Sequence, residues 1–190
     1  MKQFLDYITA RMPLSSTDKE LVEQLFIPQA FTSTTCLLKA GQVERHLYFL
    51  CHGIVKGYQN QAGKIVVGHL VTPNNFFGSL DSFMTESPSL DYFEAVTNIQ
   101  TCKISKPDFE LLKSKDSKWG NFIEQITNEH LKCKMDRVKD FQLLTAKERY
   151  LKFLKQSPEL ALQVSVESIA SFLGVEPQSL SRIRKQITRE

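Results

Sequence analysis

The residues with the clearest capacity for chemistry lie near the end of the chain, on one side of a short amphipathic segment. Between Pro177 and Arg189 there are four basic residues and no acidic one. The apolar Leu180, Ile183 and Ile187 recur at three- and four-residue steps, the spacing of one side of a helix. The other positions carry polar or basic side chains, namely Gln178, Ser179, Ser181, Arg182, Arg184 and Lys185. Such side chains can hydrogen-bond to base edges and neutralise phosphates, so the segment predicts contact with DNA.

A second helical pattern precedes this segment. Ser165 can cap a helix whose apolar residues again follow one stripe, at Val166, Ile169, Ala170 and Leu173. Gly174 ends that pattern, and Pro177 suits the first turn of the next helix. Two short helices joined by a glycine turn indicate a helix-turn-helix, which places its second helix in the major groove. The alternative is a helical hairpin that docks on another protein, in a regulatory module that binds a ligand without binding DNA.

The positive charge of the chain is concentrated at its C-terminal end. Residues 1–142 hold 16 basic and 16 acidic residues, whereas residues 143–190 hold 8 basic and 5 acidic ones. The whole net charge of +3 therefore falls in the last quarter of the chain. A neutral front and a basic end are typical of a sensor or scaffold joined to a module that binds a polyanion.

Short β-rich runs separated by glycine and asparagine turns fill the region from about residue 34 to residue 104. The expected strands are Thr34–Leu38, Leu47–Cys51, Ile54–Tyr58, Ile65–Val71, Phe93–Val96 and Ile99–Ile104. This spacing predicts a small antiparallel barrel or roll, so that the chain is of the α+β class.

A long helical pattern follows the strands. From Lys118 to Asp140, apolar residues recur at three- and four-residue steps, at Trp119, Phe122, Ile123, Ile126, Leu131, Met135 and Val138. A helix of that length would extend about 35 Å, far enough to project from a small roll. We expect two copies of the chain to dimerise along it, the alternative being that it packs on its own roll.

Several other functions find no support in the residues. The four cysteines and four histidines show no paired metal-ligand spacing, so no metal site is expected. There is no nucleophile elbow or phosphate-binding glycine loop, which argues against an enzyme. Asp6 and Arg11 interrupt the N-terminal apolar pattern, and no stretch approaches the length of a membrane span. A cytoplasmic protein without membrane contact is the resulting expectation.

The order of roll, long helix and helix-turn-helix resembles the Crp/Fnr family of bacterial transcription regulators. The segments that carry the resemblance are Gly41, Leu47–Gly53, Phe76–Gly78, Thr145–Tyr150, Ile169–Gly174 and Leu180–Ile183. It implies a cyclic-nucleotide-binding-like sensor roll with flanking helices at residues 1–116, a dimerisation helix at 117–141 and a DNA-binding domain at 142–190. It also implies a homodimer on a pseudo-palindromic operator in double-stranded DNA, with RNA polymerase as a further partner. The DNA-contacting residues would be the six polar and basic residues between Gln178 and Lys185.

By the same resemblance, a ligand cassette begins at Phe76. Its ligand-binding residues would be Gly78, Ser79, Leu80, Ser89, Leu90, Asp91 and Lys134. Family members that bind cyclic AMP use a glutamate after the cassette glycine and an arginine for the phosphate. Here Ser79 follows Gly78, and the stretch around Asp91 contains no cation. Without these charged partners, binding would desolvate the phosphate at a high cost, so we do not expect cyclic AMP to bind. The residues identify no cofactor, and an effector, if there is one, would be another small molecule.

Two details of the helix-turn-helix also differ from the family pattern. Gln178 stands where many members have glutamate. Glutamine favours adenine, whereas glutamate accepts a hydrogen bond from cytosine. Arg182 matches the family's recognition residue and suits guanine. The chain ends at Glu190, so we expect no β-hairpin wing after the recognition helix and a strongly salt-dependent affinity for DNA.

Overall fold

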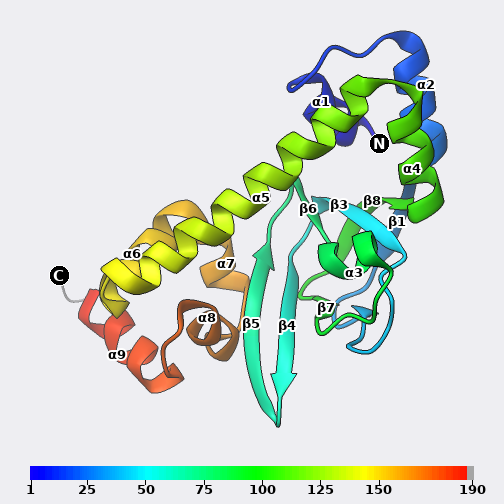
Figure 1. Ribbon diagram of the computed structural model, residues 1–190. Helices are drawn as coiled ribbons and strands as arrows, with labels where there is room; N and C mark the ends of the chain where they lie inside the picture. The colour runs from blue at the N-terminus through cyan, green and yellow to red at the C-terminus, as the bar shows by residue number, and fades with distance from the viewer. Residues whose placement is uncertain (188–190) are drawn as a thin grey trace.

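A roll of strands, one long helix and a C-terminal group of short helices follow one another along the chain (Figure 1). The computed structural model describes residues 1–187. The predicted α+β class and the predicted order of roll, long helix and helical C-terminal region are confirmed. The predicted absence of a wing concerns residues after Ile187 and lies outside the described part of the chain.

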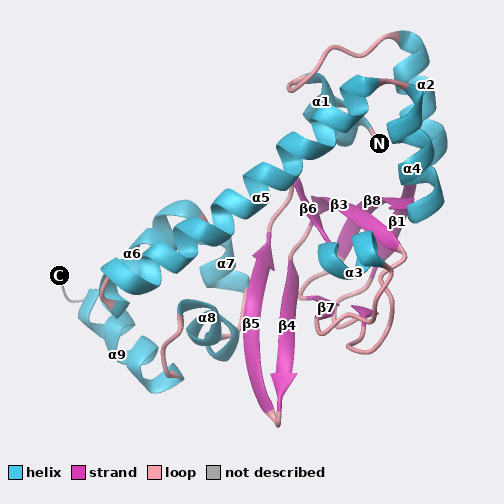
Figure 2. Cartoon of the chain, in the orientation of Figure 1, coloured by secondary structure: helices cyan, strands magenta, loops and turns pink. Residues whose placement is uncertain are grey.

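The roll consists of two antiparallel four-stranded sheets. One sheet has the order β1-β8-β3-β6 and the other the order β2-β7-β4-β5. The strands are β1 (Ile27–Phe31), β2 (Cys36–Leu38), β3 (His46–His52), β4 (Val55–Gln61), β5 (Lys64–Val71), β6 (Asn75–Phe77), β7 (Tyr92–Ala95) and β8 (Ile99–Ser105). Tyr48, Leu50, Phe77 and Phe93 form the core between the two sheets. The hairpin of β4 and β5 extends away from the rest of the roll, and β5 lies at the edge of its sheet (Figure 2).

Two of these strands have no counterpart among the predicted ones. β1 lacks an alternating apolar pattern and contains Pro28, which is tolerated because β1 pairs only with β8, at the edge of the sheet. β6 has three residues and begins at Asn75, which the sequence pattern assigns to a turn. Both are edge strands, where burial constrains the sequence least.

One set of helices packs against the roll, and a second set follows the roll in the chain. The first set comprises α1 (Lys2–Thr9), α2 (Ser16–Leu25), α3 (Leu80–Thr85) and α4 (Lys106–Lys115), and the second comprises α5 (Ser117–Leu143), α6 (Ala146–Gln156), α7 (Pro158–Gln163), α8 (Val166–Leu173) and α9 (Pro177–Ile187). Phe4 of α1, Phe49 of β3, Phe109 of α4 and Trp119 of α5 pack together in a second core. This core lies on the outer face of the β1-β8-β3-β6 sheet, because Phe49 alternates with the inward-facing Tyr48 and Leu50.

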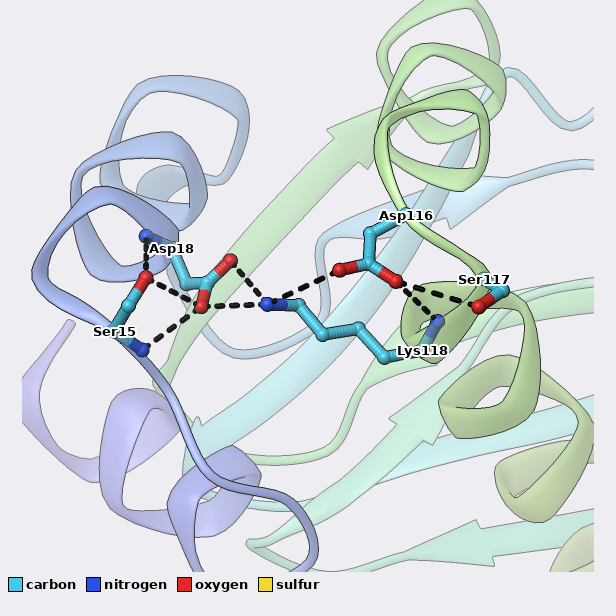
Figure 3. A network of polar contacts seen from close by, with 5 residues as sticks. All are labelled: Ser15, Asp18, Asp116, Ser117 and Lys118. Carbon is cyan, nitrogen blue, oxygen red and sulfur yellow. Dashed lines mark hydrogen bonds and ion pairs between the residues drawn. The ribbon is translucent and has the colours of Figure 1, made fainter.

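A polar network fixes the start of α5 against α2 (Figure 3). The Nζ of Lys118 lies 2.7 Å from both carboxylate oxygens of Asp18 and 3.6 Å from Asp116. Asp18 also closes a capping box, since it accepts hydrogen bonds from the N–H and hydroxyl of Ser15 at 2.8 and 2.7 Å. Asp116 caps α5 by accepting the backbone N–H of Lys118 at 2.9 Å. The contact therefore joins the caps of two helices that are 100 residues apart in sequence.

The short helices after α5 share a third core. Tyr150 and Phe153 of α6 pack with Ile169 of α8 and with Leu180 and Ile183 of α9. Gly174 ends α8 in the left-handed conformation, at φ +65°, and its N–H bonds to the carbonyls of Ala170 and Ser171. A Cβ at this position would lie 2.6 Å from the Phe141 ring. The turn between α8 and α9 therefore requires glycine for its backbone and for the ring beside it.

We expect Gly174→Ala to lower the free energy of unfolding by about 1–2 kcal/mol, because alanine strains the left-handed backbone and displaces Phe141. Gly120→Ala is the matched control, since its Cβ has no neighbour within 4 Å and alanine favours the helix by about 0.5–1 kcal/mol. Urea denaturation measures both changes. Equal effects of the two substitutions would contradict the role of the turn.

The Asp18 contact predicts a loss of stability in acid. Hydrogen bonds from Lys118 and Ser15 lower the pKa of Asp18 to about 2, below the value of about 3.9 in an unfolded chain. A lowered carboxyl pKa stabilises the fold above the unfolded value and ceases to do so as the pH falls through the folded value. Asp18→Asn should therefore cost about 1 kcal/mol near neutral pH and progressively less between about pH 4 and pH 2. Urea denaturation across this range, with the exposed Glu23→Gln of the same helix as control, measures the effect; a constant difference would contradict it.

Candidate functional site

The two helices α8 and α9 present the predicted basic face to solvent. Their apolar residues Ile169, Leu173, Leu180 and Ile183 are buried, as the periodicity predicts. On the outer side of α9 the exposed residues include Gln178, Ser179, Ser181, Arg182 and Lys185. There is no acidic residue in the first turn of α9, and Arg184 and Lys185 lie in its last turn. The structure thus brings five of the six predicted DNA-contacting side chains to one exposed surface.

Arg184, the sixth of these residues, is placed differently. It is half-buried, and its Cζ lies 5.5 Å from the centre of the Tyr150 ring. The cause is its position, four residues after Leu180 and three before Ile187, which borders the apolar stripe of α9. Its guanidinium packs on α6, so it contributes to the seating of the helix, and contact between Arg184 and DNA stays a prediction.

Arg137 of α5 joins α8 to the roll. Its guanidinium donates hydrogen bonds to the carbonyls of Gly68, of Val67 at 3.2 Å and of Phe172 at 3.0 Å. It also lies 4.2 Å from the centre of the Phe172 ring. One side chain therefore contacts strand β5 and helix α8 at the same time. Nothing in the sequence pattern singles Arg137 out from the other basic residues of α5.

Ser171 of α8 makes a second connection to the same strand. Its hydroxyl accepts the N–H of Val67 at 2.9 Å and donates to the carbonyl of Ile65 at 3.0 Å. The hydroxyl thus pairs with backbone groups that an edge strand leaves without a neighbouring strand. Together with Arg137, this contact holds the first helix of the candidate DNA-binding unit on the β4–β5 hairpin.

The predicted ligand cassette surrounds short helix α3. Ser79 and Ser89 are buried, and the Ser89 hydroxyl lies 2.8 Å from that of Ser79. The Asp91 N–H donates to Ser89 at 2.9 Å, and the Asp91 carboxylate accepts the amide of Gln59 at 2.9 Å. These side chains satisfy one another, and none of them is a cation.

Glu44 is an additional acidic group in this cassette. It is buried, and its carboxylate accepts backbone N–H groups of His46, at 3.2 Å, Ser79 and Arg45. Burial raises the pKa of Glu44 to about 6, against these hydrogen bonds. The sequence places Glu44 in a polar turn, typical of a solvated carboxylate. In the structure the Glu44 carboxylate lies against the backbone of Gly78 and Ser79, where its negative charge would repel a bound anion.

The other predicted ligand residues are dispersed. Leu90 is 75% exposed, and Leu80 lines an apolar cavity outside the sheet together with Gly78. Lys134 is exposed on α5 and lines a different cavity, beside His69 and His130. The structure therefore brings Ser79, Ser89 and Asp91 together in one cluster. Lys134 lies apart from that cluster, at a cavity that none of the three lines.

The described residues contain neither a metal-ligand cluster nor a membrane-spanning helix. Among residues 1–187 no group of three metal-ligating side chains is close enough to hold an ion, and no helix there has the length and apolar character of a membrane span. The cysteines are not all isolated, however. Cys51 and Cys102 lie on neighbouring strands with their sulfurs 3.8 Å apart. Their separation in the sequence does not indicate this tertiary contact.

Comparison with known proteins agrees with this architecture. Residues 28–116 match the family described as "Cyclic nucleotide-binding domain". No curated protein sequence matches the chain. Among solved structures, FixK2 from Bradyrhizobium japonicum superposes with a TM-score of 0.75 at 19% identity, covering 87% of this chain and 85% of that one.

Two further structures have the same arrangement over most of their length. A protein described as a transcriptional regulator of the Crp/Fnr family, from Eubacterium rectale, has a TM-score of 0.74 at 14% identity and covers 96% of this chain and 88% of its own. The c-di-GMP responsive global regulator CLP from Xanthomonas campestris has a TM-score of 0.70 at 14% identity, with 92% of each chain covered. The fold of this protein is therefore that of the Crp/Fnr transcriptional regulators, as the sequence resemblance predicts, and its roll is the part that matches the cyclic nucleotide-binding family.

Proposed function

We propose that this protein, which has the fold of the Crp/Fnr regulators, is a transcriptional regulator that binds a specific DNA sequence as a homodimer. The observation that carries the proposal is the outer face of α9, where exposed hydrogen-bonding and cationic side chains stand on a helix whose opposite side is buried. On this proposal the protein is not an enzyme, and it works in the bacterial cytoplasm, with RNA polymerase as a further partner.

The polar side chains along α9 suit base recognition near its beginning and a phosphate contact further along. Gln178 and Ser181 lie toward the beginning of the helix, and Arg182 follows on the same exposed side. In the major groove, arginine can bind guanine through two hydrogen bonds and glutamine can do the same with adenine. Lys185 lies one turn further along, where it suits a phosphate contact. The expected half-site therefore contains guanine and adenine within reach of one helix.

An exposed stripe on α5 supports dimerisation. Leu131, Met135 and Val138 are 54%, 54% and 56% exposed and recur at four- and three-residue steps. That is the seam spacing of a two-stranded coiled coil. A neighbouring side of α5 is already occupied, since Arg137 and His130 face the chain's own roll and helices. A second copy that packed on the free stripe would bury it and would give the pair of recognition helices a twofold axis.

Cyclic AMP fits the cassette poorly. The Glu44 carboxylate already accepts the Ser79 N–H, and the nearby polar residues Ser89 and Asp91 add no positive charge. A cyclic phosphate placed there would lose its hydration without a cation in return. We infer that any effector of this regulator has another chemistry or another site.

Selection from a random duplex library tests the proposed function. The wild-type protein should enrich an inverted repeat whose halves are about one helical turn apart. Arg182→Ala should weaken binding to that repeat by about tenfold or more, because a bidentate contact to a base is worth about 1–3 kcal/mol. Lys19→Ala on exposed α2, far from α9 in sequence, is the control and should leave the affinity unchanged. If Arg182→Ala keeps both affinity and sequence preference, Arg182 does not read bases. If the wild-type protein enriches no repeat, docking of α9 on a protein is favoured instead.

The oligomeric state tests the role of α5. Leu131→Glu should convert the dimer to a monomer in sedimentation at micromolar concentration, because it places a charge in an apolar seam. Leu162→Glu, on the 87% exposed leucine of α7, is the matched control and should leave the dimer intact. A dimer that survives Leu131→Glu would exclude this stripe as the interface.

A further inference from the structure

Two cavities adjoin beneath α5. The first has a volume of about 100 Å³ and is lined almost entirely by apolar side chains, among them Trp119 and Phe122. The second, of about 320 Å³, extends along β5 toward α6, α7 and α8. Phe76, Ile126 and His130 line both. The space therefore has an apolar end and a polar end, which meet at these three side chains.

The polar end carries positive charge without a matching carboxylate. Lys134 supplies a positive charge one helical turn beyond His130 of α5. His130 and His69 of β5 stack with ring centres 5.6 Å apart and, with lowered pKa values, are neutral groups that can donate N–H hydrogen bonds. Within residues 1–187 no acidic side chain pairs with Lys134. Glu129, the acidic residue of the lining, is 3.5 Å from Arg11.

Arg137 strengthens this imbalance. Its hydrogen bonds go to backbone carbonyls of β5 and α8, so its charge is also without a carboxylate in the described part of the chain. Burial lowers the pKa of His69 to about 3, with Lys134, His130 and Arg137 adding to the effect. Burial and Lys134 lower the pKa of His130 in the same direction. Burial raises the pKa of Tyr7, another group of the lining, so its hydroxyl is neutral. An anion would relieve this excess of positive charge.

We propose that the adjoining cavities bind a small amphipathic anion, with its apolar tail against Trp119 and Phe122 and its head between His69, His130 and Lys134. The first space, of about 100 Å³, is smaller than the apolar cavity of about 150 Å³ that accepts benzene, so it suits a short alkyl chain better than a ring. The head group would gain charge-assisted hydrogen bonds in the second. Gly78, Leu80 and Lys134 of the predicted ligand residues line these cavities, whereas Ser79, Ser89 and Asp91 line neither. The proposed site therefore shares three residues with the predicted cassette but lies outside its serine and aspartate cluster.

The position of the site suggests its regulatory effect, which rests on the proposed DNA-binding function. The polar end is lined by Phe153, Leu160 and Phe172 of the C-terminal helices as well as by β5 of the roll. A head group at His69 and Lys134 lies beside the Arg137 contacts that hold α8 on β5. A ligand that binds better when these helices are docked, or when they are released, shifts that equilibrium by the difference in its two affinities.

The single tryptophan of the chain, Trp119, reports on the apolar end. Hexanoate and hexyl phosphate, titrated against the full-length protein without DNA, should change its fluorescence saturably. Hexanol and hexylammonium, of equal tail length, should bind at least about tenfold more weakly because they lack the negative charge. Comparison of the two anions shows which head group the polar end prefers.

Lys134→Gln and Lys132→Gln form the matched pair of variants, since both lysines are exposed on α5 but Lys132 lies outside these cavities. Lys134→Gln should weaken both anions about tenfold and leave hexanol unchanged, while Lys132→Gln should change neither. Isothermal titration calorimetry on the same samples detects anion binding even where it does not reach Trp119, so it distinguishes binding at another site from no binding.

The proposal is overturned if neither anion binds, if hexanol binds as tightly as the anions, if the two variants behave alike, or if binding leaves Trp119 unaffected. Because no DNA is present, such a result would leave the selection of an inverted repeat untouched. A failure of that selection would in turn leave the binding of the anion standing.

Discussion

The contacts of Arg137 connect the three parts of this structure. Its backbone belongs to the long helix, while its guanidinium binds carbonyl groups of β5, an edge strand of the roll, and of helix α8. Ser171 pairs with the same strand from the side of α8. An edge strand exposes unpaired backbone groups that ordinarily invite another strand. Here α8 covers part of that edge, so edge strand β5 also sets the position of the α8–α9 pair.

This arrangement divides the surface of α5 between two tasks. One side, with His130, Arg137 and Phe141, faces the roll and the C-terminal helices of the same chain. Another side presents Leu131, Met135 and Val138 to solvent. The two ends differ too, because Trp119 and the Lys118 network anchor the beginning of the helix against α2 and the outer core. Any change at the roll that moves α5 therefore reaches both the proposed dimer seam and the proposed DNA-binding helices α8 and α9.

Residues whose role follows from periodicity could be predicted from the sequence. The buried stripe of α8 and α9 and the exposed Gln178, Ser181 and Arg182 result from the 3.6-residue repeat alone, and the order of roll and long helix follows from strand and helix patterns of strong contrast. Arg184 was predictable in principle, since its spacing from Leu180 and Ile187 places it beside the apolar stripe and not on the far side.

The remaining features depend on tertiary contacts between distant segments. Glu44 resembles an ordinary turn carboxylate until the fold brings the Ser79 backbone to it, and Arg137 resembles its basic neighbours until β5 and α8 meet around it. The Cys51–Cys102 contact and the His69–His130 stack arise in the same way. A local pattern indicates which face of an element is buried, but it does not indicate which partner lies against that face.

The most direct measurement places a photo-cross-linking amino acid at Ser181 and reads the cross-linked positions on a duplex obtained by selection. We expect two cross-linked positions on the duplex, related by a twofold axis and separated by about one turn of DNA, because each protomer would insert one α9 helix into the major groove. The same cross-linker at Leu162 should give none of these positions. Cross-links at a single position, or none at Ser181, would contradict a dimer that reads DNA with α9.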